Sequence, residues 1–277
     1  MINYTGRKKN DYLDMALDSG RLGYIDSPKS LTFESEVFVA LVPVSQRDYA
    51  RPELLTETEW LAQHLNNPKV RIIDAQSSKQ YIAGHIPGAV NLTGFTAIPR
   101  AANQDMAAPE EFNRVAGNLG ISNDMTVVVY DTPTQVMGMI AWGFLYYGHQ
   151  DVRILDGGFH KWSREGRPIS SDAVTYPPTA YKAKPVEDIY CSLAEAKDSH
   201  GQPQTIFWDT RSRAEYEGSA ASAGGEPPPR LGRIPGSIHL EWTELLEPVN
   251  KTFKSAVELR ALLESKGITP EKNINTY

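Results

Sequence analysis

Short apolar runs alternate with amphipathic segments along the chain after residue 50. Runs rich in β-branched and aromatic residues, bounded by turn residues, predict buried strands. Apolar residues at helical spacing predict helices between them. The strands are expected at 71–75, 126–130, 152–155, 206–210 and 273–277, and the helices at 56–65, 109–120, 134–149, 158–166, 191–196 and 254–267. This alternation favours an α/β fold in which a parallel β-sheet is flanked by helices.

Several helix ends carry capping signals. Thr56 and Glu59, and likewise Ser192 and Glu195, have the spacing of a capping box at a helix start. Gly120 and Gly267 follow two of the amphipathic helices closely and are expected to terminate them.

The chain contains an internal repeat. Asp74 and Tyr81 recur as Asp209 and Tyr216, both 135 positions later, and "HIPGAVNL" (85–92) recurs as "RIPGSIHL" 148 positions later. The change of offset reflects an Ala-, Gly- and Pro-rich insertion after Tyr216, whose composition indicates a surface loop. Downstream, "NLGISNDMTVVVY" (118–130) aligns with "SKGITPEKNINTY" at an offset of 147. The sequence therefore holds two versions of one unit, and the second ends at the strand that closes with Tyr277.

The repeat sets the expected domain boundaries. Residues 1–51 match neither version and form an N-terminal extension. The first repeat comprises residues 52–167, a linker without clear periodicity spans 168–190, and the second repeat comprises 191–277. The second is expected to be incomplete, because the first continues beyond Tyr130 with a helix, a strand and a further helix. Its missing elements would leave helix faces and a sheet edge uncovered.

Composition excludes several classes of protein. The net charge of −6 argues against a nucleic-acid partner, which would need a basic excess. A single cysteine, Cys191, allows no intrachain disulfide and indicates no oxidising compartment. No apolar run is long enough for a membrane span, and the first twenty residues lack a signal-peptide core. We expect a cytoplasmic protein without a membrane partner.

The repeated motif carries a family resemblance. An acid at a strand end, then Tyr, then Gly-(His/Arg)-Ile-Pro-Gly-(Ala/Ser), then a strand ending in Tyr, resembles the rhodanese fold. "RILDGGFHKW" (153–162) resembles the closing strand and helix of that domain. Two such units in tandem, over about residues 52–277, are similar to thiosulfate and 3-mercaptopyruvate sulfurtransferases. The resemblance implies two rhodanese-like domains, the first of them inactive.

The resemblance also implies a chemistry. A cysteine directly after the Tyr strand of the second domain takes sulfane sulfur from thiosulfate or mercaptopyruvate. It forms a persulfide and passes the sulfur to a thiol or cyanide, with no metal or organic cofactor. The first repeat has Asp131 at this position, which cannot carry sulfur. In the second repeat the nucleophile would follow Tyr277, so residues 1–277 alone are expected to be inactive.

Asp209, Arg211 and Trp242 are the candidate substrate-binding residues, because the resemblance places them at the border of the active site. Each also has a structural interpretation. Asp209 can cap a loop, as the equivalent Asp74 suggests. Arg211 has Gln76 as its counterpart, which leaves both interpretations open, and Trp242 fits a core position equally well.

The remaining candidates are weaker. Cys191 precedes a helix, away from either strand-end loop, and is expected to be a buried apolar residue. His85 and Arg233 precede equivalent turns and are expected to be structural, and the histidines show no metal-ligand spacing. Glu215 stands where the resemblance to mercaptopyruvate enzymes implies an arginine for the donor's carboxylate, which favours a thiosulfate-type donor.

Two alternatives stay open. A non-catalytic binding or regulatory module could use the same fold, as Asp131 in the first repeat illustrates. A rhodanese-like phosphatase also uses a loop cysteine and would differ in the length of that loop. The residue after Tyr277 separates the first alternative from an enzyme.

Overall fold

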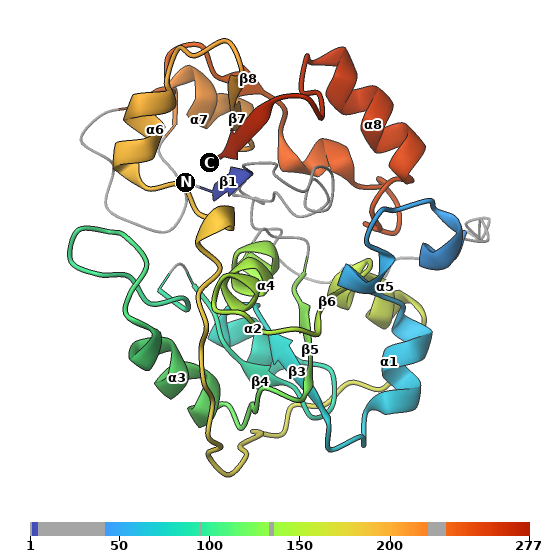
Figure 1. Cartoon of the computed structure of the whole chain (residues 1–277). Helices are drawn as coiled ribbons and strands as arrows, with labels where there is room; N and C mark the ends of the chain where they lie inside the picture. Colours follow the sequence, from blue (N-terminus) through green and yellow to red (C-terminus); the bar gives the residue numbers. More distant parts are fainter. Residues whose placement is uncertain (1, 5–41, 95, 133–135, 221–230) are drawn as a thin grey trace.

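The computed structural model describes residues 2–4, 42–94, 96–132, 136–220 and 231–277. Within these residues the chain forms two α/β units, each a sheet with helices packed against it (Figure 1). The α/β class predicted from the alternating pattern is confirmed. None of the helices in this part of the chain has the length and apolar character needed to cross a membrane.

The first repeat contains a five-stranded sheet in which every pair of neighbours is parallel. Parallel pairing requires crossover connections, and helices supply most of them. In spatial order the strands are β2 (Leu55–Thr56), β6 (Val152–Leu155), β5 (Thr126–Tyr130), β3 (Val70–Asp74) and β4 (Val90–Asn91).

Helices cover both faces of this sheet, so successive residues of a central strand alternate between two apolar environments. In β5, Val128 packs with Leu61 and Trp162, whereas Val127 and Val129 lie in the cluster on the opposite face. The first face carries α1 (Thr58–His64) and α5 (Gly158–Arg164), and the other carries α3 (Pro109–Asn118) and α4 (Val136–Tyr146).

The second repeat contains a sheet of order β1-β9-β7-β8. Strand β7 (Thr205–Asp209) lies between β8 (Ile238–His239) and β9 (Asn273–Thr276), and pairs with both in parallel. The remaining elements of this repeat are α6 (Leu193–Ser199), α7 (Arg213–Glu217), the 3-10 turn η5 (Trp242–Leu245) and α8 (Ala256–Ser265).

The outer edge of β9 is paired, contrary to the expected uncovered edge. Strand β1 (Ile2–Tyr4) runs antiparallel along β9, on the side where β6 pairs with β5 in the first repeat (Figure 1). An edge strand presents unpaired backbone groups, and a segment from the N-terminal extension can satisfy them with antiparallel geometry.

One predicted cap is confirmed and one is wrong. Ser192 caps α6, and its hydroxyl and the side chain of Glu195 form the expected reciprocal pair. Thr56 does not cap α1, because it belongs to β2, where its carbonyl accepts a hydrogen bond from the Asp156 amide at 2.9 Å. The helix begins two residues later, after Glu57, whose side chain makes no cap bond.

A buried ion pair between the N-terminal extension and the first repeat is hydrogen-bonded to the second repeat. The Arg47 guanidinium, just after the 3-10 turn η2 (Val44–Gln46), donates to the fully buried Asp156 carboxylate at 2.7 Å and to the Phe253 carbonyl at 3.1 Å. The other Asp156 oxygen accepts from the Phe253 amide at 2.9 Å. A single carboxylate therefore links the end of the N-terminal extension, the first repeat and the second repeat.

The predicted linker crosses the first repeat as an extended strap, which ends in the 3-10 turn η4 (Glu187–Ile189). The Thr179 amide donates to the Gly117 carbonyl at 3.0 Å, and the Tyr176 ring lies 3.1 Å from the Arg71 guanidinium. The close approach depends on a glycine: a β-carbon added at Gly117 would lie 2.6 Å from the Thr179 carbonyl oxygen.

This contact generates a stability prediction. Alanine normally stabilises a helix interior by about 1 kcal/mol relative to glycine. In Gly117→Ala the added methyl group collides with the strap, so we expect a net loss of about 1–3 kcal/mol in the free energy of unfolding. Asn118→Ala, one residue further on the exposed side of α3, is the matched control and should change it by less than about 0.5 kcal/mol. Urea denaturation measures both, and equal midpoints for the two variants would contradict the strap contact.

Candidate active site at the carboxyl ends of β7 and β9

The carboxyl end of a parallel sheet is where open α/β folds place their ligands. In the second repeat this edge is formed by Asp209 at the end of β7 and Tyr277 directly after β9. The Tyr277 carbonyl accepts hydrogen bonds from both the amide and the hydroxyl of Thr210, each at 3.0 Å. The last peptide of β9 is therefore fixed against the strand end of β7.

Asp209 and Arg211 form a two-pronged ion pair at this edge. Nε and Nη2 of Arg211 donate to the two carboxylate oxygens of Asp209, at 2.9 and 2.6 Å. Nη2 also donates to the Gly232 carbonyl at 2.9 Å, and the guanidinium lies 5.3 Å from the centre of the Tyr277 ring. The hydrogen bonds to Asp209 raise the pKa of Arg211. Asp209 is fully buried, so it orients Arg211 rather than facing solvent itself.

The equivalent edge of the first repeat is built with neutral partners. Asp74 accepts from the side chain of Gln76 at 2.9 Å and from the Tyr130 hydroxyl at 2.5 Å. Burial raises the pKa of Asp74, while these hydrogen bonds oppose the rise. The acid is thus common to both edges, and the second repeat alone gives it a cationic partner, Arg211.

Other contacts recur at equivalent positions of the two repeats. The Tyr130 hydroxyl accepts from the Ile86 amide at 2.9 Å, and the Tyr277 hydroxyl accepts from the Ile234 amide at 3.0 Å. Likewise Tyr81 donates to the Ala89 carbonyl, as Tyr216 does to the Ser237 carbonyl. His85 stacks on Tyr81, and Arg233 lies over the ring of Tyr216 at 4.4 Å.

Trp242 supports the edge from behind. It is 2% exposed, and its amide donates to the Thr210 carbonyl at 3.0 Å. Its side chain belongs to the large apolar cluster that contains residues of both repeats. The geometry brings Asp209, Arg211 and Trp242 to one edge, with Arg211 the most exposed of the three.

A further residue at this edge was not predicted as part of the site. Glu215 lies in the first turn of α7 and forms a capping box with Ser212. The residue is 4% exposed, and its Oε1 atom is buried without a hydrogen-bond partner. The sequence carried one signal for this residue: the equivalent position of the first repeat holds Gln80, so the charge of the side chain differs between the repeats.

The strand end of the first repeat is closed. Asp131, directly after β5, is buried, and its carbonyl accepts from the Phe159 amide at 2.8 Å. A β-carbon on Gly158 would lie 2.3 Å from the same carbonyl oxygen. Helix α5 therefore packs directly on the position that corresponds to the residue after Tyr277.

Cys191 is a buried apolar residue, as expected. It is 1% exposed and packs with Ala196 and Phe207. Burial, together with the nearby Glu195 charge, raises the pKa of the Cys191 thiol to about 11. Among the described residues, no group of three or more His, Cys, Asp or Glu side chains is arranged to hold a metal ion.

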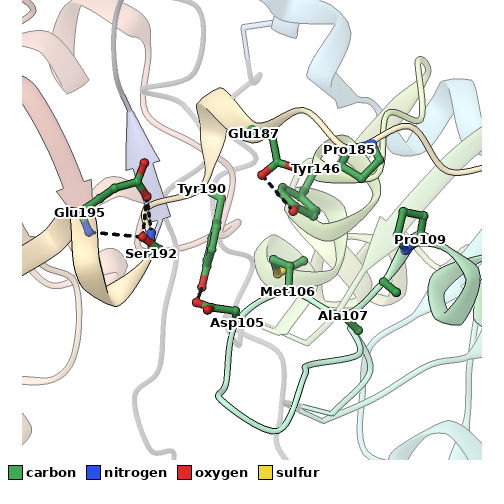
Figure 2. A pocket seen from close by; sticks show the side chains of 11 residues that line it. Asp105, Met106, Ala107, Pro109, Tyr146, Pro185, Glu187, Tyr190, Ser192 and Glu195 are labelled. Atoms are coloured by element: carbon green, nitrogen blue, oxygen red, sulfur yellow. Dashed lines mark hydrogen bonds between the residues drawn. The ribbon is translucent and has the colours of Figure 1, made fainter.

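A cavity of about 450 Å³ lies elsewhere, between the first repeat and the start of α6 (Figure 2). Tyr190 donates to Asp105 at 2.8 Å across its wall, and Tyr146 donates to Glu187 at 3.4 Å. Asp209, Arg211 and Trp242 do not line it. The cavity is therefore separate from the strand-end site.

Comparisons with known proteins agree on one family. A sequence model described as the rhodanese-like domain matches residues 57–165. The sulfur carrier protein TtuD of Thermus thermophilus is 37% identical over 242 residues, covering 83% of each chain. A putative thiosulfate sulfurtransferase of Mycolicibacterium smegmatis is 34% identical over 234 residues, covering 82% of this chain and 83% of that protein. The structure of SseA from Escherichia coli, described as a 3-mercaptopyruvate sulfotransferase, matches with a TM-score of 0.67 at 25% identity, over 80% of this chain and 87% of that one.

The ion pair at the strand end generates one prediction. Asp209→Ala leaves Arg211 without its buried partner, so we expect the free energy of unfolding to fall by on the order of 3 kcal/mol. Arg211→Gln reproduces the pair seen in the first repeat, where Gln76 satisfies Asp74, and should cost about 1 kcal/mol. Urea denaturation compares the two variants. An Arg211→Gln loss as large as that of Asp209→Ala would show that the first repeat is not a valid guide to the second.

The buried environment of Cys191 generates a second prediction, which concerns the reactivity of its thiol. With a pKa of about 11, roughly one thiol in a thousand is ionised at pH 8, and the side chain is also shielded from reagents. We expect Ellman's reagent to label Cys191 at least about 100-fold more slowly in the folded chain than in 6 M guanidinium chloride. Similar rates in both conditions would make Cys191 a candidate nucleophile after all.

Proposed function

The chain belongs to the rhodanese family of sulfurtransferases, and on that premise we propose that it transfers sulfane sulfur through a persulfide on a cysteine directly after Tyr277. The donor we propose is thiosulfate, with mercaptopyruvate as the alternative, and the acceptor is a thiol or cyanide. The observation that carries the proposal is the fixed end of β9, where Thr210 holds the Tyr277 carbonyl with two hydrogen bonds. The backbone of the residue that follows Tyr277 would therefore begin at a fixed position near Arg211.

The reaction has two balanced steps. The cysteine thiolate attacks the outer sulfur of thiosulfate, which forms a new S–S bond, breaks the S–S bond of the donor and releases sulfite. Cyanide then attacks the outer sulfur of the persulfide, which gives thiocyanate and restores the thiolate. A covalent intermediate of this kind divides one transfer into two steps, and neither step needs a metal.

The three predicted site residues have different roles in this proposal. Arg211 is the candidate for direct contact with an anionic donor, because its side chain is partly exposed while its orientation is fixed by Asp209. Asp209 and Trp242 are buried and act through Arg211 and Thr210. Glu215 stands where the resemblance to mercaptopyruvate enzymes implies an arginine for the donor's carboxylate, and its presence there supports thiosulfate as the donor.

The names of the relatives support the transfer of sulfur in general terms, since they describe a sulfur carrier protein and thiosulfate sulfurtransferases. The second candidate function is a non-catalytic module. It is favoured for the first repeat by Asp131 at the strand end, which is buried and cannot carry sulfur.

The proposal is tested with two forms of the protein. Residues 1–277 should produce no thiocyanate from thiosulfate and cyanide, because no described side chain at the strand end is a nucleophile for sulfur. The protein carried through its natural residues beyond Tyr277 should gain the mass of one sulfur atom after incubation with thiosulfate, and lose it with cyanide. Cys191→Ser is the matched control and should load normally.

Two outcomes would contradict the proposal. Turnover by residues 1–277 would place the nucleophile elsewhere. A natural protein with a residue other than cysteine after Tyr277, together with no sulfur loading, would favour the binding module.

A further inference from the structure

The second repeat carries an insertion after Tyr216 that the first repeat lacks, and the proposed function does not use it. Residues 218–220 form its first end and residues 231–232 its second end, within the part of the chain that the structure describes. We call these two ends the insertion base. They lie beside Arg211, since the Gly232 carbonyl accepts a hydrogen bond from its Nη2 atom at 2.9 Å.

The first end of the insertion base is fixed to the end of α7. Gly218 has a φ of +76°, the left-handed conformation that commonly ends a helix. The amides of Ser219 and Ala220 both donate to the Ala214 carbonyl, at 2.9 and 3.2 Å. The last turn of α7 therefore determines where the insertion begins.

The second end of the insertion base packs directly on the first. A β-carbon added at Gly218 would lie 3.1 Å from the amide nitrogen of Gly232 and 3.2 Å from its α-carbon. The two backbone segments can approach this closely because Gly218 has no side chain. The Gly232 carbonyl is thus held in place by α7, and through this carbonyl the insertion base contacts Arg211.

This contact determines which donors of Arg211 stay open. A guanidinium has five N–H groups. Nε and Nη2 each donate one to the carboxylate of Asp209, and Nη2 donates its second to Gly232. Nη1 makes no hydrogen bond to any residue that the structure describes, and the side chain is 18% exposed. Nη1 is therefore the nitrogen through which Arg211 can bind an anion.

The first repeat has neither the arginine nor the insertion. Gln76 stands at the place of Arg211 and donates to Asp74 at 2.9 Å. Helix α2 (Ser78–Ala83) ends directly at Gly84, the counterpart of Gly232, with no residues inserted between them. The cation and the insertion thus occur in the same repeat and contact each other there, which indicates a shared role.

We propose that the insertion base is a positioning element for Arg211: the Gly232 carbonyl takes the second N–H of Nη2 and leaves Nη1 to bind the anionic donor. The inference rests on the proposed function only for the identity of that anion. The contact itself lies entirely within residues 209–232, so it can be tested without sulfur transfer.

A pair of glycine variants isolates the contact. In Gly218→Ala the added methyl group meets the backbone of Gly232 and displaces its carbonyl, while Arg211 is unchanged. Gly267→Ala is the matched control, because Gly267 follows α8 with the same φ of +76° and a β-carbon there meets nothing within 4 Å. Both variants carry the same backbone strain, so a difference between them reports the contact with Gly232.

The first test measures the contact by NMR in residues 1–277. The Nη2 protons of Arg211 should exchange slowly with solvent, because both are hydrogen-bonded. We expect this exchange to be at least about threefold faster in Gly218→Ala than in Gly267→Ala. Equal exchange rates in the two variants would overturn the proposal, whether or not the protein transfers sulfur.

The second test separates positioning from folding, in the protein carried through its natural residues beyond Tyr277. Gly218→Ala should raise KM for thiosulfate at least about threefold and leave kcat within about twofold, since a binding contact is lost. Gly267→Ala should leave both values within about 1.5-fold. Equal KM values for the two variants would show that the insertion base only supports the fold. Absence of turnover in the unmodified protein would contradict the proposed function, and the exchange rates would still decide the role of the insertion base.

Discussion

A buried carboxylate at the end of the central strand organises the candidate site of each repeat. Burying an ionised carboxylate costs free energy unless its oxygens are hydrogen-bonded. The side chains next to such an acid must therefore be ones that can donate hydrogen bonds to it. Asp74 obtains neutral partners, Gln76 and Tyr130. Asp209 obtains the guanidinium of Arg211 instead. The same constraint therefore yields a neutral edge in one repeat and an edge with an oriented cation in the other.

A second buried acid, Asp156, determines how the repeats are joined. One of its oxygens accepts from Arg47 and the other from the Phe253 amide, so displacing either segment would leave a buried carboxylate oxygen without its donor. The apolar cluster is also continuous across the junction, with Phe144 on one side and Leu240 on the other. The second repeat is thus held against the first as part of one core.

The sequence predicted the parts of the structure that depend on local pattern. Strands β3, β5, β6, β7 and β9, the cap at Ser192 and the position of Tyr277 followed from periodicity and from the repeat. The two- and three-residue strands β1, β2, β4 and β8 were not predicted, because they are too short to show a pattern. The predicted cap at Thr56 was wrong because Thr56 belongs to β2 and pairs with β6. The side chain of the next residue, Glu57, accepts a hydrogen bond from the amide of Val44 at 2.8 Å and does not cap the helix either. The free oxygen of Glu215 could not be predicted either, since a capping pattern shows which residue is used and not which of its atoms is left over.

The closed strand end of the first repeat explains how one fold can serve two purposes. The carbonyl of Asp131 is bonded to α5, and Gly158 permits that helix to approach where any side chain would collide. The residue at this position is an aspartate that is 1% exposed, and it cannot carry sulfur. Because the acid, the tyrosine and the Pro-Gly turn are kept in this closed unit, their primary role is to build the strand end. Among the described residues of the two strand ends, Arg211 stands against Gln76 and Glu215 against Gln80, so these pairs distinguish the surroundings of the position that Asp131 occupies in the first repeat.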